Sequence, residues 1–223
     1  INIPFGSSIG VIGDTGSGKT TIAKLLLRLY EPTKGSIILG DYDICELDIN
    51  YLRNKIGIVS QEPFLFNSSI RDNICYGVEK PLPKEVDRVV SQSQLDEFIN
   101  DLPNGIDTLV GERGQMLSGG QRQRISIART LMRNPEVIIF DEATSSVDNR
   151  TEQLIQRALF TISKGRTSII IAHRLSTIRN CNNILVLKHG KIIEQGNHDA
   201  LLQNKNSYYS KLWKIQTGIH VDT

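Results

Sequence analysis

A glycine-rich segment that contains one lysine is the strongest chemical signal in the sequence. It reads Gly13, Asp14, Thr15, Gly16, Ser17, Gly18, Lys19, Thr20 and Thr21. Glycines allow consecutive backbone N–H groups to curl around phosphate oxygens. An apolar run precedes the segment and a helical pattern follows it, and the positive end of a helix favours an anion. We predict a phosphate-binding loop in which Lys19 reaches the β- and γ-phosphates of a nucleotide and Thr20 binds Mg²⁺. A glycine-rich turn with an incidental lysine is the alternative.

A second motif places two acids directly after an apolar run. Residues 137–140 are Val-Ile-Ile-Phe, and Asp141 and Glu142 follow. In nucleotide-hydrolysing proteins an acid at the end of such a strand holds Mg²⁺. The next carboxylate, here Glu142, could orient and activate a water molecule. Many buried strands end in an acid, so this motif indicates a nucleotide site only in combination with the glycine-rich loop.

A third motif, like the first, places glycines directly before a helical pattern. Leu117, Ser118, Gly119, Gly120 and Gln121 lead into a helical pattern. A serine and two glycines at a helix N-terminus could form a second anion site. The alternative interpretation is a helix with a serine N-cap after a flexible turn. Two phosphate-type sites in one chain suggest a nucleotide that is shared between two copies.

The elements that must position these motifs alternate along the chain. Runs typical of strands occur at 9–12, 36–39, 56–59, 137–140, 167–172, 184–187 and 191–194. Helical periodicity begins directly after Gly18, where Ile22, Leu25, Leu26 and Leu29 share one face. Strands that alternate with helices predict an α/β fold with a mostly parallel sheet. From Glu62 to Pro135 helical patterns dominate, so we predict a core of residues 1–61 and 136–223 with an inserted helical subdomain at 62–135.

Composition excludes several classes of protein. The chain has 223 residues, is 39% hydrophobic and carries a formal net charge of +2. This balance is typical of globular domains and argues against nucleic-acid partners. No apolar run approaches the roughly 20 residues that cross a bilayer. The first residues, Ile1 to Pro4, lack the features of a signal peptide. Three cysteines without metal-like spacing suggest reduced thiols in the cytosol.

Taken together, the motifs resemble the nucleotide-binding domain of an ABC transporter. Residues 117–121 match that family's signature sequence without a departure. Gln61 resembles the Q-loop glutamine, and residues 145–148 are similar to the D-loop, with Asp148 in its acidic position. His173, after the 167–172 run, resembles the switch histidine. The resemblance covers essentially the whole chain and implies a P-loop (RecA-like) core that carries an all-helical signature subdomain.

Two further segments resemble the exporter group of this family. Residues 110–114, Val-Gly-Glu-Arg-Gly, are similar to the exporter X-loop, and residues 63–67 resemble the exporter sequence after the Q-loop glutamine. In that group these regions meet coupling helices of a membrane domain, which we expect before residue 1. The resemblance therefore implies a position at the cytosolic face of a membrane, within an integral transporter.

The resemblance also implies a mechanism. Two domains would pair head to tail around two ATP molecules, as a homodimer or a heterodimer. Thr20, Gln61 and Asp141 would hold Mg²⁺, and Glu142, His173 and Gln61 would act in catalysis. The residues that would contact the nucleotide from the partner copy are Ser118, Gly119, Gly120, Gln121 and Asp148.

One family feature is missing. The aromatic A-loop residue that stacks on adenine lies some two dozen residues before the P-loop, but Gly13 is preceded by only twelve residues. The resemblance therefore implies a truncated antiparallel β-subdomain without this residue. Two other functions stay open: a soluble ABC-type ATPase and a regulatory domain without activity. Chromosome-type ATPases insert a long coiled coil, and no sustained heptad pattern lies between Lys19 and Ser118.

Overall fold

The computed structural model describes residues 1–141, 149–172 and 174–218. Its strands are β1 (Ser8–Gly13), β2 (Ile38–Leu39), β3 (Tyr42–Asp43), β4 (Ile56–Val59), β5 (Val137–Asp141), β6 (Thr167–Ile171), β7 (Asn183–Lys188) and β8 (Lys191–Gly196). Its α-helices are α1 (Lys19–Leu26), α2 (Ile49–Lys55), α3 (Ile70–Cys75), α4 (Pro83–Gln92), α5 (Asp96–Asn100), α6 (Gly119–Met132), α7 (Asn149–Ser163), α8 (Leu175–Ile178), α9 (His198–Gln203) and α10 (Tyr208–Thr217). Two short 3₁₀ helices, η1 (Gly105–Asp107) and η2 (Glu112–Gly114), precede α6.

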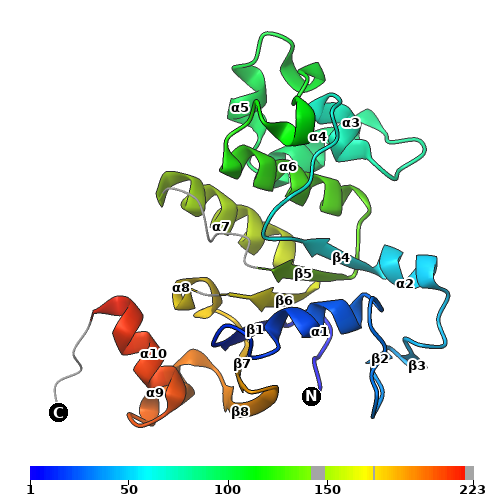
Figure 1. Ribbon diagram of the computed structural model, residues 1–223. Coiled ribbons are helices and arrows are strands. Elements are labelled where there is room, and N and C mark those ends of the chain that lie inside the picture. Colours follow the sequence, from blue (N-terminus) through cyan, green and yellow to red (C-terminus); the bar gives the residue numbers. More distant parts are fainter. Residues whose placement is uncertain (142–148, 173, 219–223) are drawn as a thin grey trace. The chain divides into compact units, whose positions relative to one another are not determined.

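A mostly parallel sheet confirms the predicted α/β class. Its six strands lie in the order β4-β5-β6-β1-β7-β8, and β2 and β3 form a separate antiparallel pair. Strand β1 is parallel to both neighbours, with Ile9 opposite Ile169 of β6 and Asn183 of β7 (Figure 1). The β-branched side chains of Ile9, Val11 and Ile12 in β1 are buried, as expected for a strand that is covered on both faces. This packing fixes the point at which β1 ends and the glycine-rich loop begins.

The last two strands form a hairpin. β7 and β8 are antiparallel, and Lys188 pairs with Lys191 next to the turn. His189 and Gly190 both have positive φ, 48° and 73°, which a two-residue hairpin turn requires. The hairpin leads into α9 and α10.

The chain divides into two units. One unit contains residues 1–53, 139–142 and 167–223, and the other contains residues 54–138 and 143–166. In the second unit α6 is the central helix, because α3, α4, α7 and β4 all contact it. Every regular element between Gln61 and Glu136 is helical. The limits proposed for the helical insertion, 62–135, remain a prediction.

Helix α1 is shorter than its apolar pattern suggested. It ends at Leu26, and Leu29 is 54% exposed instead of sharing the helical face. Arg28 adopts a left-handed conformation with φ 50°, and its guanidinium donates hydrogen bonds to the carbonyls of Ile44 (3.3 Å) and Leu47 (2.8 Å). These bonds come from distant residues, so periodicity alone could not reveal them. Within the described residues, no helix is both long enough and apolar enough to cross a membrane.

Candidate functional site

The glycine-rich loop starts in tight contact with β7. A methyl group placed on Gly13 would lie 2.2 Å from the carbonyl oxygen of Leu187 and 2.7 Å from Ser17 Oγ. Any side chain there would force the loop and β7 apart. Gly13 therefore allows the backbone to turn directly at the carboxyl end of β1, the edge at which parallel α/β sheets bind ligands.

The loop then curves into α1 without a capping side chain. The N–H of Ser17 donates to the carbonyl of Asp14 at 3.1 Å, which closes a turn, and Gly16 within it has φ 77°. Gly18 is the N-cap of α1 with φ 102°, and no side chain of the described residues caps this helix. The first N–H groups of a helix need partners. At α1 a bound anion can supply them.

Lys19 lies at the centre of this loop. Its residue is only 5% exposed, and its Nζ donates to the carbonyls of Gly13 (2.8 Å) and Asp14 (3.0 Å). An ammonium group has three N–H bonds, so this position permits a further bond to a phosphate oxygen. Ser17 Oγ is buried and has no hydrogen-bond partner among the described residues. A donor-rich, uncapped loop with a buried cation fits a polyphosphate.

The residues predicted to bind Mg²⁺ carry oxygen atoms of the right kind. Thr20 is exposed in the first turn of α1, and Asp141 is half-buried at the carboxyl end of β5. A hydroxyl and a carboxylate are hard oxygen donors, which Mg²⁺ prefers. Gln61 is exposed just beyond β4. The assembly of these three groups around one ion remains a prediction, and the described residues hold no cluster of three His, Cys, Asp or Glu that could bind a metal.

The signature segment carries its own cap. Ser118 Oγ accepts a hydrogen bond from Gln121 N–H at 3.2 Å, and Gln121 Oε1 accepts one from Ser118 N–H at 2.7 Å. The serine N-cap is the feature that the alternative interpretation predicted, and the bond to Gln121 completes a capping box. Ser118 and Gly119 are exposed, whereas Gly120 is buried. An anion site here remains a prediction.

A side chain of the signature helix also fixes the backbone next to Gln61. Gln123 of α6 is 3% exposed, and its Nε2 donates to the carbonyl of Ser60 at 3.1 Å. Farther along, Arg129 donates to the carbonyls of Phe64 and Asn73, both at 2.7 Å. The segment after β4 is thus bonded to the helix that begins at the signature.

Comparison with known proteins decides the family. The family model for ABC transporters matches residues 1–145. This chain belongs to the ABC transporter family. Mouse ATP-binding cassette sub-family B member 10, mitochondrial, is 49% identical over 97% of this chain and 31% of its own length. Heterocyst differentiation ATP-binding protein HepA from Nostoc is 47% identical over 99% of the chain and 36% of its own length.

A solved structure supports the same assignment. A bacterial Atm1-family ABC exporter with ATP bound matches with a TM-score of 0.89 and 45% identity, over 95% of this chain and 37% of that one. The resemblance to ABC exporters is therefore confirmed at the level of the family and the fold. The chain spans about a third of the length of these relatives.

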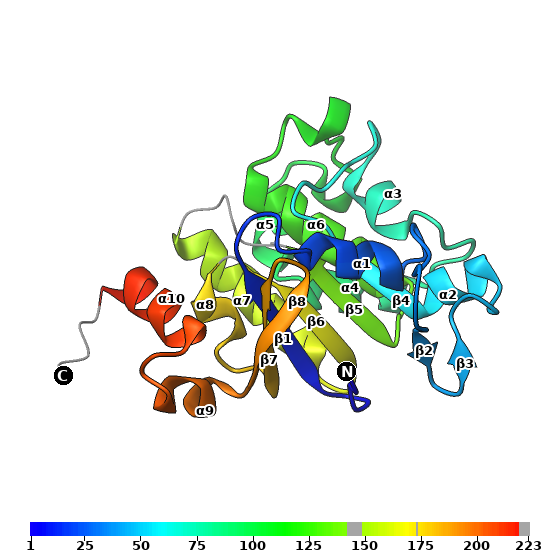
Figure 2. The same cartoon turned by 60° about the horizontal axis from the view of Figure 1, so that its bottom comes forward.

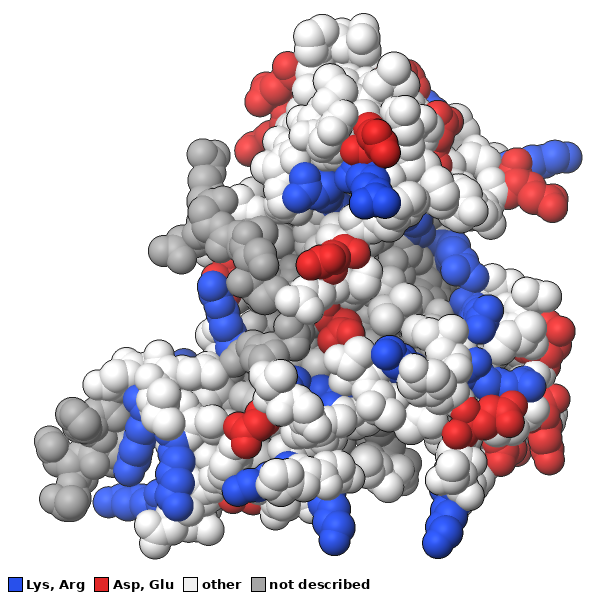
Figure 3. All heavy atoms as spheres, in the orientation of Figure 1, with Lys and Arg blue, Asp and Glu red and all other residues white. Residues whose placement is uncertain are grey.

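Several residues assigned from the ABC pattern lie outside the described residues. They are Glu142, Asp148 and His173. Their assigned roles therefore remain predictions. On the face in Figure 3, basic and acidic side chains are interspersed, in keeping with the near-neutral composition.

Two contacts to the glycine-rich loop could not be predicted from the ABC motifs. Gly190 in the β7–β8 turn donates its N–H to the carbonyl of Ser17 at 3.1 Å, and Figure 2 shows this turn beside the loop from β1 to α1. The Tyr208 hydroxyl, at the start of α10, donates to Asp14 Oδ1. Motif spacing carries no signal for either contact, because each partner is more than 170 residues from the loop.

Proposed function

We propose that this chain is the ATP-binding and ATP-hydrolysing motor domain of an ABC exporter. The observation that carries the proposal is the start of α1, where an uncapped helix follows a loop centred on the buried ammonium of Lys19. A triphosphate satisfies both the open N–H groups and the cation. The family and the ATP-bound exporter with the same fold support ATP as the triphosphate.

The residues of the loop would hold the phosphates. Backbone N–H groups from Asp14 to Thr21 and the ammonium of Lys19 supply the donors. Thr20, Asp141 and Gln61 would hold Mg²⁺, which, when bound, offsets phosphate charge during hydrolysis. Fixed donors of this kind stabilise the charge that develops in phosphoryl transfer.

Glu142 would serve as the general base that accepts a proton from the attacking water. It directly follows Asp141, the last residue of β5. His173 would contact the γ-phosphate, and Gln61 would link the phosphate site to the helical insertion. These roles come from the positions that match the ABC pattern.

Two partners complete the proposal. A second nucleotide-binding domain would present Ser118, Gly119, Gly120, Gln121 and Asp148 to the nucleotide bound by the first. Coupling helices of a membrane domain would contact the segments after Gln61 and before the signature. Exposed apolar side chains in these regions, Phe64 (55%) and Met116 (69%), support such a contact. The chain would then act at the cytosolic face of a membrane.

Glu142→Gln tests the proposed chemistry. We expect ATP to bind normally, because the amide keeps the size of the side chain, while turnover falls about 1,000-fold, since a general base contributes 10²–10⁴-fold. The variant should also trap the ATP-bound dimer, which gel filtration measures. Glu136→Gln, a matched change before β5 that loses the surface ion pair with Lys55, should leave turnover unaltered. A near-normal rate in Glu142→Gln contradicts the assigned role.

A further inference from the structure

The C-terminal part of the chain is bonded to the phosphate-binding loop at two points. One is the bond from Gly190 N–H to the Ser17 carbonyl, and the other joins the Tyr208 hydroxyl to the Asp14 carboxylate. All four residues belong to one unit of the structure. The second contact involves side chains on both sides, so it can be removed without changing the backbone.

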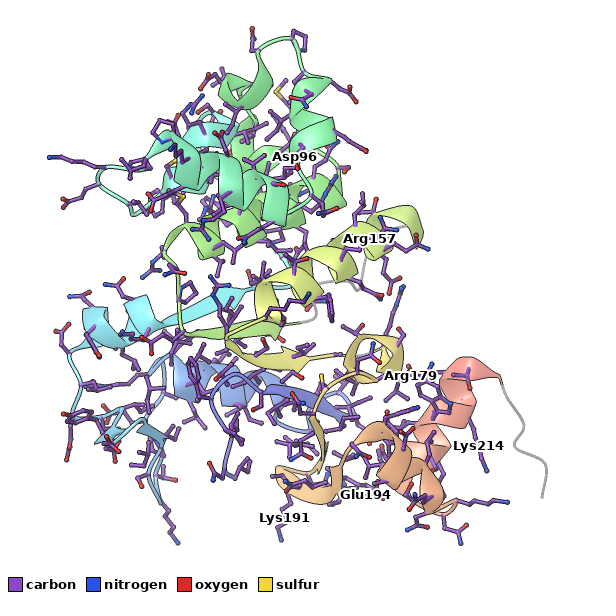
Figure 4. All side chains as sticks on the ribbon, turned by 180° about the vertical axis from the view of Figure 1, so that it is seen from behind. Asp96, Arg157, Arg179, Lys191, Glu194 and Lys214 are labelled. Carbon is purple, nitrogen blue, oxygen red and sulfur yellow. The ribbon has the colours of Figure 1, made fainter. Side chains whose placement is uncertain are left out.

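The start of α10 is firmly fixed, and this fixes Tyr208. Ser207 Oγ caps the helix by accepting from Ser210 N–H at 3.0 Å. Glu194 of β8, labelled in Figure 4, accepts the N–H groups of Tyr208 and Tyr209 with its two carboxylate oxygens. Because three N–H groups of the first turn have partners, the helix start is pinned to the hairpin. Tyr208 therefore reaches Asp14 from an anchored position.

The charges around this contact explain why a hydrogen-bond donor next to the Asp14 carboxylate would favour phosphate binding. Asp14 is an exposed carboxylate in a loop that we expect to bind a polyanion, and its charge would repel phosphate. The Tyr208 hydroxyl holds Asp14 Oδ1 toward α10, and Lys188 Nζ lies 5.2 Å from the centre of the Tyr208 ring. The hydrogen bond to Asp14 raises the pKa of Tyr208 to about 12, so the phenol stays protonated and remains a donor at physiological pH.

The same contact acts on the turn of the loop. The Asp14 carbonyl accepts both the Ser17 N–H (3.1 Å) and Lys19 Nζ (3.0 Å). Fixing the Asp14 side chain thus restricts the residue whose carbonyl organises the loop and its lysine. A loop that is ordered before binding loses less conformational entropy when the ligand arrives.

We propose that Tyr208 is a positioning residue for the phosphate-binding loop, which it acts on by holding the Asp14 carboxylate against α10. The inference rests on the proposed function, because it assumes that the loop binds ATP. The Tyr208 hydroxyl would act through Asp14, so it would support nucleotide affinity and leave the chemical step unchanged.

Tyr208→Phe in the intact protein tests the inference, since it removes one hydroxyl and keeps the ring under Lys188. We expect KM for MgATP to rise about five-fold, the scale of one lost hydrogen bond, while kcat changes less than about two-fold. Tyr209→Phe is the matched control: its hydroxyl contacts His198 Nδ1 at 2.8 Å and not the loop. That variant should lower the melting temperature and leave KM unchanged.

A double-mutant cycle with Asp14→Ala separates positioning from general stability. Once Asp14 has lost its carboxylate, Tyr208→Phe should have no further effect on KM. The inference is wrong if Tyr208→Phe leaves KM unchanged or lowers only kcat. It is also wrong if Tyr208→Phe raises KM as much in the Asp14→Ala background as in the wild type. If the unaltered protein neither binds nor hydrolyses ATP, the proposed function fails and the inference fails with it. If the wild type binds and hydrolyses ATP and Tyr208→Phe has the same KM, only the inference about Tyr208 is rejected and the proposed function stands.

Discussion

The starts of α1 and α6 use similar residues in opposite ways. Both helices follow a segment rich in serine and glycine. At α1 the N-cap is Gly18, and no described side chain caps the helix, whereas at α6 Ser118 and Gln121 bond to each other's backbone. The N–H groups of α6 are thus partly satisfied by the chain itself. Those of α1 lie next to the ammonium of Lys19, so this helix start offers donors and a positive charge to an anion.

This contrast shows that similar residues before two helices do not decide whether a helix start binds an anion. Glycine and serine before a helix are compatible with an anion site and with a self-capped helix. The buried lysine and the hydroxyl of Ser17, which has no hydrogen-bond partner among the residues that the structure describes, distinguish the first helix from the second. We therefore expect nucleotide affinity to depend on the residues at the start of α1. The stability of the unit that contains α6 should depend on the residues at the start of α6.

Lys19→Ala should have the largest effect on binding. Removal of the buried ammonium takes away a charged phosphate partner, and charge-assisted hydrogen bonds are about twice as strong as neutral ones. We expect affinity for MgATP to fall about 100-fold in a calorimetric titration. Lys24→Ala on the same helix, whose ammonium lies near the Tyr30 ring, should bind ATP as the wild type does. Equal affinity in Lys19→Ala and wild type would contradict the assigned role of the loop.

Among changes at the start of α6, Gly120→Ala should lower the free energy of unfolding the most. A methyl group there would lie 1.9 Å from Thr151 Cγ2, so α6 and α7 must shift. Overpacking of this kind costs about 1–3 kcal/mol in the free energy of unfolding, which urea titration measures. At Gly119 the nearest atom is the Arg122 guanidinium, 3.9 Å away, and Gly119→Ala should be near neutral. Equal stability of the two variants would refute the close approach of the helices.

Ser118→Ala should have a smaller effect. It removes the N-cap of α6 and should lower the free energy of unfolding by about 1 kcal/mol. Ser118→Thr keeps a hydroxyl acceptor and serves as the control. If Ser118→Ala unfolds at the same urea concentration as both the wild type and Ser118→Thr, the Ser118 hydroxyl does not stabilise α6.

Local patterns predicted the scaffold of the site well. The strand that ends at Gly13, the helix that begins at Lys19 and the strand that ends at Asp141 all follow from periodicity and breaker residues. The serine before α6 also indicated an N-cap, as the alternative interpretation of the third motif proposed. In each case the partners lie within a few residues of one another, so the sequence contains the whole interaction.

Contacts between distant residues escaped prediction. The end of α1 depends on carbonyls of Ile44 and Leu47 that bind Arg28. The contact between Asp14 and Tyr208 joins residues 194 positions apart. Such contacts arise only when the strands bring the segments together, and no motif encodes them.

Hydrogen exchange of the backbone amides would show whether the loop before α1 binds the phosphates of ATP. With saturating MgATP, we expect exchange of the amides from Gly16 to Thr21 to slow at least about ten-fold, because phosphate oxygens accept their hydrogen bonds. In Lys19→Ala at the same nucleotide concentration, this protection should be largely lost. Unchanged exchange of these amides in the wild type would show that the loop does not bind the nucleotide.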